Sequence, residues 1–169
     1  MIKCFPTLAI ILFCTGCAAN SSLGKATVNL VGNEPCFAPI SDYQVLLTAI
    51  FVSEAGATAD WKTRAQEMWV MTVDPPGNKI ELPTGSCIRY GESLNKTKTQ
   101  KPAQALMAQK AYNLFIEGKS AQERRNLLGY GTAFCLIPSA DGKTFAAATV
   151  YDRAAEKWQD SRCNAVAPK

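Results

Sequence analysis

Most of this chain is a succession of short segments that are apolar or alternate between apolar and polar residues, each ended by glycine, proline or a polar run. The clearest are residues 26–31, 43–52, 68–73, 79–82, 130–137 and 144–151. Alternation with a period of two is typical of a strand with one buried face, and Gly and Pro mark the turns between strands. Strands at such close spacing predict a mainly β chain, folded as a single antiparallel β-sandwich or barrel-like domain.

Two of the expected strand pairs are hairpins. Residues 130–137 and 144–151 flank an Asp141-Gly142 turn, and residues 26–31 lead through a Gly-Asn-Glu-Pro turn to Cys36-Phe37. Residues 103–115 are rich in helix formers, but the alternation that ends at Ile116 predicts a strand over residues 111–117. Residues 53–67 fit a loop or one or two helical turns.

The first 17 residues have the form of an export signal. Lys3 precedes an uncharged, largely apolar run over residues 4–13, which is too short to span a bilayer. The run leads into Cys14-Thr-Gly-Cys17, which resembles the bacterial lipobox, although Cys14 replaces the usual leucine. We expect cleavage after residue 16 and lipidation of Cys17. An ordinary signal peptide, cut after Ala19, is the alternative.

The expected domain organisation is simple. Residues 1–16 are the signal peptide, residues 17–25 the lipidated cysteine with a small, polar tether, residues 26–163 the β domain and residues 164–169 a frayed end. Removing 16 of the 169 residues leaves 153, enough for one domain with a real core. Ala18 is not the aspartate associated with inner-membrane retention. Likeness to other lipoproteins therefore implies that the domain lies in the bacterial periplasm, anchored by its lipid to the outer membrane.

Four cysteines remain after the leader and the lipidated residue are set aside: Cys36, Cys87, Cys135 and Cys163. An even number in an exported chain predicts two disulfide bonds. Three pairings are possible, and loop entropy hardly separates them because it grows only with the logarithm of loop length. Nearness along the chain favours Cys36 with Cys87 and Cys135 with Cys163.

The composition gives little support to catalysis. The chain has no histidine, which removes the commonest general base and metal ligand. Cys36, Cys87, Cys135 and Cys163 lack Cys-x-x-Cys spacing, and no phosphate-binding glycine loop is present. The remaining acids, Glu67, Asp74, Glu81, Asp141 and Asp152, are interpreted as solvated surface groups. We therefore expect no enzyme activity, catalytic residue, metal or cofactor.

The candidate contact residues are basic and aromatic. Lys96, Lys98 and Lys101 lie in an expected loop over residues 92–104, with no acid after Glu92, and could meet an acidic partner, although charge runs on loops are usually solvated. Trp61 and Trp158 lie amid charged residues and are either packed at an edge or anchors in an interface. After removal of the leader, 17 basic residues face 14 acidic ones, a surplus too small and scattered to favour nucleic acid.

Several short motifs, taken in order, carry a family resemblance. After the lipobox come Val31-Gly-Asn-Glu-Pro-Cys-Phe37, Glu67-Met-Trp69, Cys87-Ile-Arg-Tyr-Gly91, Phe134-Cys135 and the closing stretch from Lys157-Trp158 to Cys163. This order is similar to that of the type VI secretion system immunity periplasmic lipoproteins of bacteria, over almost the whole mature domain. The resemblance implies a disulfide framework and a protein that binds and neutralises an antibacterial effector in the periplasm.

Other functions share these features. A lipid anchor, disulfides and charged loops equally fit a lysozyme-type enzyme inhibitor or a lipoprotein that scaffolds envelope assembly. The expected partners are a protein, with an effector toxin favoured, and the membrane through the lipid. The sequence does not specify the oligomeric state.

Overall fold

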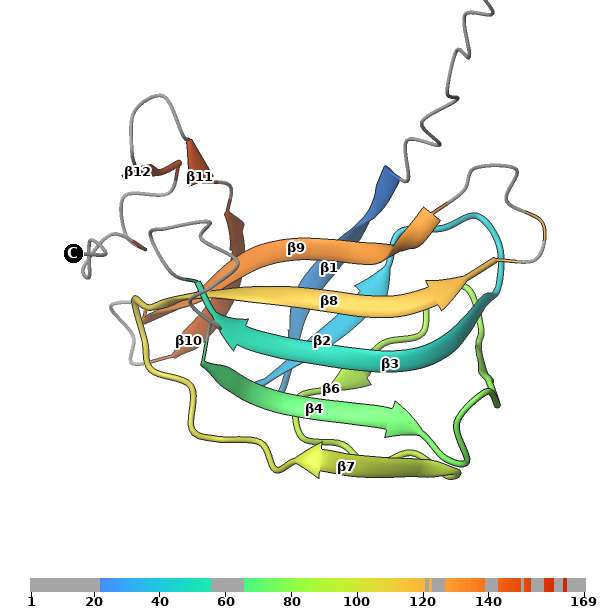
Figure 1. The fold of residues 1–169 in the computed structure, drawn as a ribbon. Helices are drawn as coiled ribbons and strands as arrows, with labels where there is room; N and C mark the ends of the chain where they lie inside the picture. The colour runs from blue at the N-terminus through green and yellow to red at the C-terminus, as the bar shows by residue number, and fades with distance from the viewer. Residues whose placement is uncertain are drawn as a thin grey trace, which may run out of the picture.

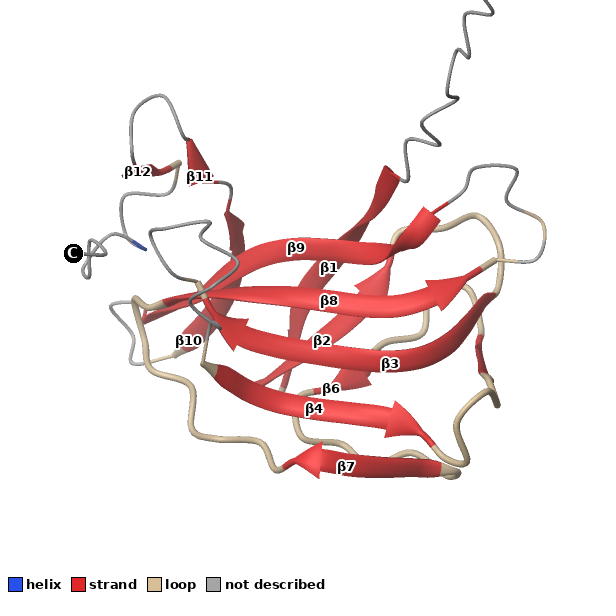
Figure 2. Ribbon diagram, viewed as in Figure 1, coloured by secondary structure: helices blue, strands red, loops and turns tan. Residues whose placement is uncertain are grey.

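A computed structural model describes residues 22–55, 66–120, 122, 127–138, 143–149, 151–152, 157–159 and 163. Strands dominate the described part of the chain (Figure 2). They are β1 (Ser22–Val31), β2 (Glu34–Pro39), β3 (Val45–Glu54), β4 (Glu67–Val73), β5 (Ile80–Leu82), β6 (Ile88–Arg89), β7 (Thr97–Lys101), β8 (Ala111–Lys119), β9 (Leu127–Pro138), β10 (Thr144–Thr149), β11 (Tyr151–Asp152) and β12 (Lys157–Trp158). No helix among these residues is long and apolar enough to cross a bilayer.

The main sheet has ten strands and curls on itself. Its order is β6-β2-β1-β9-β8-β3-β4-β7, with β10 also paired to β9 and β5 to β3, while β11 and β12 form a separate two-stranded sheet. The curl carries β1, β2 and β6 behind β8, β3 and β4 (Figure 1). The prediction of a mainly β fold is confirmed.

The sheet is mixed, so the prediction of a purely antiparallel arrangement is wrong. Strand β1 pairs with β9 in parallel, through Ser22 with Leu127 and Lys25 with Gly131. Alternation of apolar residues shows which face each side chain takes and carries no information about the direction of the neighbouring strand. The pattern therefore could not predict a parallel pair between the first strand and one about a hundred residues later.

The predicted local pairings are confirmed. Strands β1 and β2 form a hairpin in which Val31 pairs with Glu34 across a two-residue turn. Gly32 has φ of 66° in this turn, and glycine at the first central position is typical of the type II′ turns that suit hairpin twist. Strands β9 and β10 form the second hairpin. The strand predicted over residues 111–117 is β8, which extends to Lys119.

The core lies between the front and back of the curled sheet. It contains the inward side chains of β1, β2, β3, β4, β8 and β9: Val28, Phe37, Leu47, Ile50, Val52, Trp69, Met71, Tyr112, Leu114, Ile116, Tyr130 and Phe134. The ring of Phe37 on β2 lies 5.4 Å from that of Phe134 on β9 and 6.4 Å from that of Trp69 on β4, measured between centroids. These contacts hold the two sides of the curl together.

The N-terminal boundary differs from the predicted one. Strand β1 begins at Ser22, inside the range 17–25 that was predicted as tether. The strand is held closely here, since a Cβ at Gly24 would lie only 2.6 Å from Cδ1 of the buried Tyr130. The small, polar residues here predict a flexible segment, but pairing of residues 22–25 with β9 orders them without needing apolar side chains.

Two disulfides brace the sheet. Cys36 on β2 is bonded to Cys87, which immediately precedes the short edge strand β6, and Cys135 on β9 is bonded to Cys163. These are the pairs favoured by nearness along the chain. The first bond fastens an edge strand that pairs with β2 through only two residues, Ile88 and Arg89.

Candidate functional site

The structure gathers the three candidate lysines on one edge of the sheet. The range 92–104, predicted as a loop, contains strand β7, so that prediction is wrong for residues 97–101. Among the described strands β7 pairs only with β4, which leaves its second edge without a strand. Lys98 and Lys101 lie within β7, and Lys96 lies in the turn just before it.

The turn before β7 holds Lys96 in an unusual backbone conformation. Its φ is 63°, in the left-handed region that residues other than glycine rarely adopt. The backbone is fixed on both sides, because Asp74 N–H donates to the Lys96 carbonyl at 2.9 Å and Thr97 Oγ1 donates to the Leu94 carbonyl at 2.7 Å. The turn that leads into β7 is thus held in place by hydrogen bonds on both sides of Lys96.

Lys98 and Lys101 point to the outer face of the sheet. In the register of β7 with β4, Lys98 lies opposite Thr72 and Lys101 opposite Val70. Thr72 and Val70 alternate with the core residues Trp69 and Met71, so their side chains take the outer face, and directly opposed residues share a face. The register shift between Val70 and Met71 allows Lys98 and Lys101, three residues apart, to take the same face.

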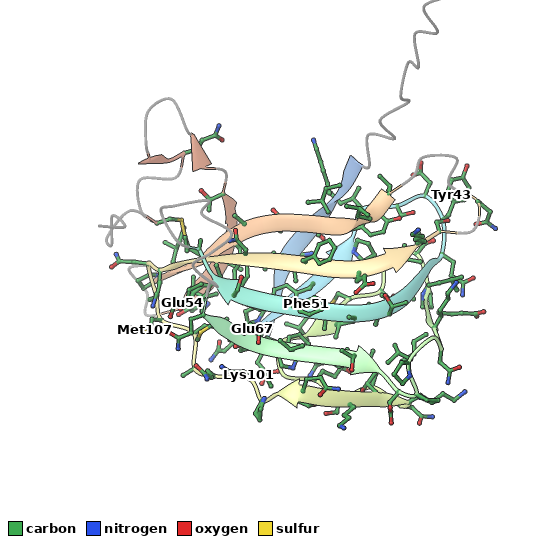
Figure 3. The ribbon with its side chains drawn as sticks, viewed as in Figure 1. Tyr43, Phe51, Glu54, Glu67, Lys101 and Met107 are labelled. Carbon is green, nitrogen blue, oxygen red and sulfur yellow. A yellow bond between two sulfur atoms is a disulfide. The ribbon has the colours of Figure 1, made fainter. Side chains whose placement is uncertain are left out.

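An aromatic pair continues this row across the outer face. Val70 pairs with Phe51 on β3, and Phe51 pairs with Phe115 on β8, their rings stacked at a centroid distance of 6.1 Å. Both phenylalanines are half-buried. Figure 3 shows Phe51 on β3 and Lys101 at the end of β7. We call Lys98, Lys101, Val70, Phe51 and Phe115 the outer-face row.

The lysines of this row carry unneutralised charge. Within the described part of the chain, the ion pair formed is Lys110 with Glu54, where β8 begins and β3 ends. Lys96, Lys98 and Lys101 make no ion pair with any described residue. The edge strand therefore presents positive charge on the same face as two half-buried aromatic side chains, a charge complementary to an acidic surface.

Of the two candidate tryptophans, Trp158 does not join this row. Trp61 lies outside the described residues. Trp158 is in β12, paired with Tyr151 of β11, and Figure 1 shows this small sheet well away from β7. The lipidation residue Cys17 also lies outside the described residues.

The motif residues that carry the family resemblance are mostly structural. Phe37, Trp69 and Phe134 are fully buried, and Tyr90 packs edge-on against Trp69 with a centroid distance of 5.5 Å. The Tyr90 hydroxyl lies 2.8 Å from the Gln104 carbonyl and 3.1 Å from the Met68 carbonyl, and its burial raises its pKa to about 12. These residues hold the two ends of the curled sheet together.

The acidic residues are dispersed. Glu67, Asp74 and Glu81 are exposed on three different elements, and Glu81 accepts a 2.9 Å hydrogen bond from Gln44 Nε2. In the described ranges no three metal-binding side chains come together. Among the described residues, Glu67, Asp74 and Glu81 form no acidic cluster.

A second surface feature is a set of exposed apolar side chains. The exposed fractions are 56% for Leu23, 54% for Ile40, 46% for Tyr43 and 56% for Leu128. Leu23 is at the start of β1, Ile40 and Tyr43 are in the connection from β2 to β3, and Leu128 is at the start of β9.

Sequence reasoning missed Phe51, Phe115 and this apolar set. Phe51 was hidden in a continuous apolar run, where no alternation tells the two faces apart. Phe115 did leave a signal, because it falls out of phase with the alternating residues of its strand. Leu23 was the single large apolar residue in the supposed tether.

Comparisons with protein-family models, with curated proteins and with solved structures find no match for this chain.

Proposed function

We propose that this chain is a lipid-anchored periplasmic binding protein that neutralises a type VI secretion effector, with the outer-face row as its inhibitory surface. The supporting observation is that row, in which two unneutralised lysines on an edge strand share a face with a stacked aromatic pair, with Val70 between Lys101 and Phe51. The export signal cleaved before Cys17 and the order of the motifs support the location and the class of partner.

The row suits inhibition because it lies on a braced surface. Strands β3, β4 and β8 are central to the sheet, and a rigid surface loses little conformational freedom on binding. Aromatic side chains supply contact area, and the lysines speed encounter with an acidic partner. No residue of the chain needs to perform chemistry for such a protein to act.

The direct test is rescue from an effector. The effector encoded beside this gene, directed to the periplasm, should arrest growth, and co-expression of the full chain should restore it. Absence of both rescue and a complex on co-purification would refute the immunity function. Envelope-assembly genes in that position would instead favour the scaffold alternative.

A charge reversal tests the surface. Lys98→Glu should weaken binding to the effector in detergent solution by about tenfold or more, since rim charges in complementary interfaces are each worth of order 1 kcal/mol. Lys25→Glu is the matched control, because Lys25 is also exposed but lies on β1, which Figure 1 shows behind β8, β3 and β4. Equal affinities would remove the row from the proposal. Lysines on an edge strand also hinder that edge from pairing with the edge of a second copy of the chain. Measuring the self-association of both variants tests this role separately from binding to the effector.

A further inference from the structure

We propose that one end of the sheet, carrying Leu23, Ile40, Tyr43 and Leu128, rests on the surface of the lipid bilayer. We call it the Leu23 end. The inference rests on lipidation of Cys17, which is part of the function proposed above, and adds a second contact between the domain and the membrane. It follows from where the chain enters the sheet and from which side chains are exposed there.

Strand register places these four residues at the same end. Parallel pairing puts the starts of β1 and β9 together. The end of β8 lies there too, since Ile116 pairs with Tyr130, and the start of β3 follows because Leu46 pairs with Lys119. The end of β2 completes the set, with Ile40 N–H donating to the Lys25 carbonyl at 2.8 Å.

The exposed apolar residues are unevenly distributed. In the described part of the chain six large hydrophobic side chains are exposed, and four of them are at the Leu23 end. The other two, Val31 at the end of β1 and Met107 ahead of β8, belong to the opposite end. Figure 3 shows Tyr43 and Met107 at opposite ends of the sheet.

The start of β1 keeps this end close to the lipid. Only residues 18–21 separate Cys17 from Ser22, and an extended chain reaches at most about 18 Å over that interval. Strand β1 then runs for ten residues, or about 30 Å, to Val31. A lipid on Cys17 therefore holds the Leu23 end within reach of the bilayer, whereas Val31 lies a strand's length away.

Among the described residues, the exposed charged groups around this end carry no excess of positive charge. Lys25 and Lys119 are exposed there, and so are Asp42, Glu81 and Glu117. These residues therefore do not attract anionic headgroups, and apolar contact carries the interaction. The contact should persist in about 0.5 M salt, where exposed charges are largely screened.

Photocrosslinking in living cells tests the proposal. The full chain, with its leader, is expressed in a Gram-negative host with p-benzoylphenylalanine at position 23, 40 or 128, and with the same group at position 31 or 107 as matched exposed controls. Irradiation should yield phospholipid adducts at least about fivefold more often at the first three positions, because acyl-chain contact requires apolar groups at the interface.

A second comparison removes the apolar contact without touching the core. With the crosslinker at position 43, Leu23→Asp combined with Leu128→Asp should lower the lipid adduct at least about threefold, while Val31→Asp with Met107→Asp should leave it unchanged. All four sites are exposed, so both variants should fold.

The outcomes separate the two proposals. Equal adduct yields at the two ends, in protein whose Cys17 carries a palmitate analogue, would overturn the bilayer contact and leave the anchor intact. Loss of that label would overturn the anchor and this inference together. Higher yields at the Leu23 end in labelled protein would support both.

Discussion

At the scale of single residues, Gly24 is required by a close approach between β1 and β9. An alanine Cβ would lie 2.6 Å from Tyr130 Cδ1 and 3.3 Å from Leu127 Cδ1. Tyr130 is fully buried, so its ring cannot move aside easily. Removing the flexibility of glycine from the unfolded chain stabilises by at most about 1 kcal/mol, and the clash outweighs that gain.

We predict that Gly24→Ala lowers the free energy of unfolding by about 1–3 kcal/mol, as other overpacking substitutions do. Urea unfolding in detergent solution measures the effect as a lower midpoint at unchanged slope. Lys25→Ala, at the exposed neighbouring position, should change stability by less than about 0.5 kcal/mol. A Gly24→Ala midpoint at or above the wild-type value would refute the close approach.

Tyr90 makes stability depend on pH in the alkaline range. Burial raises its pKa from 10.0 to about 12 in the folded protein. Folding therefore favours the protonated hydroxyl, and this contribution is fully present below pH 10 and lost as the pH rises through about 12. Burial also raises the pKa of Tyr112, so the two tyrosines act in the same direction.

We predict that Tyr90→Phe lowers stability by about 0.5–1.5 kcal/mol at pH 8 through loss of the hydrogen bond, and that the difference from wild type shrinks toward pH 12. Denaturation curves recorded at intervals from pH 8 to 12 provide the measurement. Tyr43→Phe is the control, because Tyr43 is exposed. A constant difference across this range would show that Tyr90 is not the group responsible.

At the scale of elements, the disulfide between Cys36 and Cys87 compensates for a weakly paired edge. Strand β6 contributes two paired residues to β2, too few to hold it against the loss of chain entropy. The bond spans 51 residues, whereas the bond between Cys135 and Cys163 spans 28.

We predict that replacing Cys36 and Cys87 together by alanine costs about 2–4 kcal/mol, and that replacing Cys135 and Cys163 costs nearly as much, because the logarithm of loop length separates the two by only about 0.5 kcal/mol. Thermal or urea unfolding of the two double variants measures both values. A double variant as stable as wild type would show that the fold holds that segment without its disulfide.

The sequence best predicts the strands that bury apolar side chains in the core. The alternation in β8, the hairpin turn at Gly32 and the apolar run in β4 all combine local preference with burial. Strand β7 has neither, since Thr97–Lys101 is polar throughout and forms because β4 offers it a backbone edge. Such a strand depends on a neighbour thirty residues away, which no local pattern reveals.

At the scale of the whole molecule, the surface was harder to predict than the core. Trp69 could be assigned to the interior from its apolar neighbours, and it is fully buried. The outer-face row joins β7, β4, β3 and β8, and the Leu23 end joins five strand ends. Both depend on registers between distant segments, so sequence reasoning named Lys98 and Lys101 as candidates but could not place them beside Phe51 and Phe115 or gather the Leu23 end.

The parallel pairing of β1 with β9 also affects when the chain can fold. A polypeptide that leaves the ribosome with its N-terminus first presents Ser22–Val31 long before Leu127–Pro138 is available to pair with it. The first strand can form its hairpin with β2, but the sheet cannot assemble until most of the chain has arrived, and contacts so distant in sequence form slowly. The topology thus delays completion of the sheet until β9 is available.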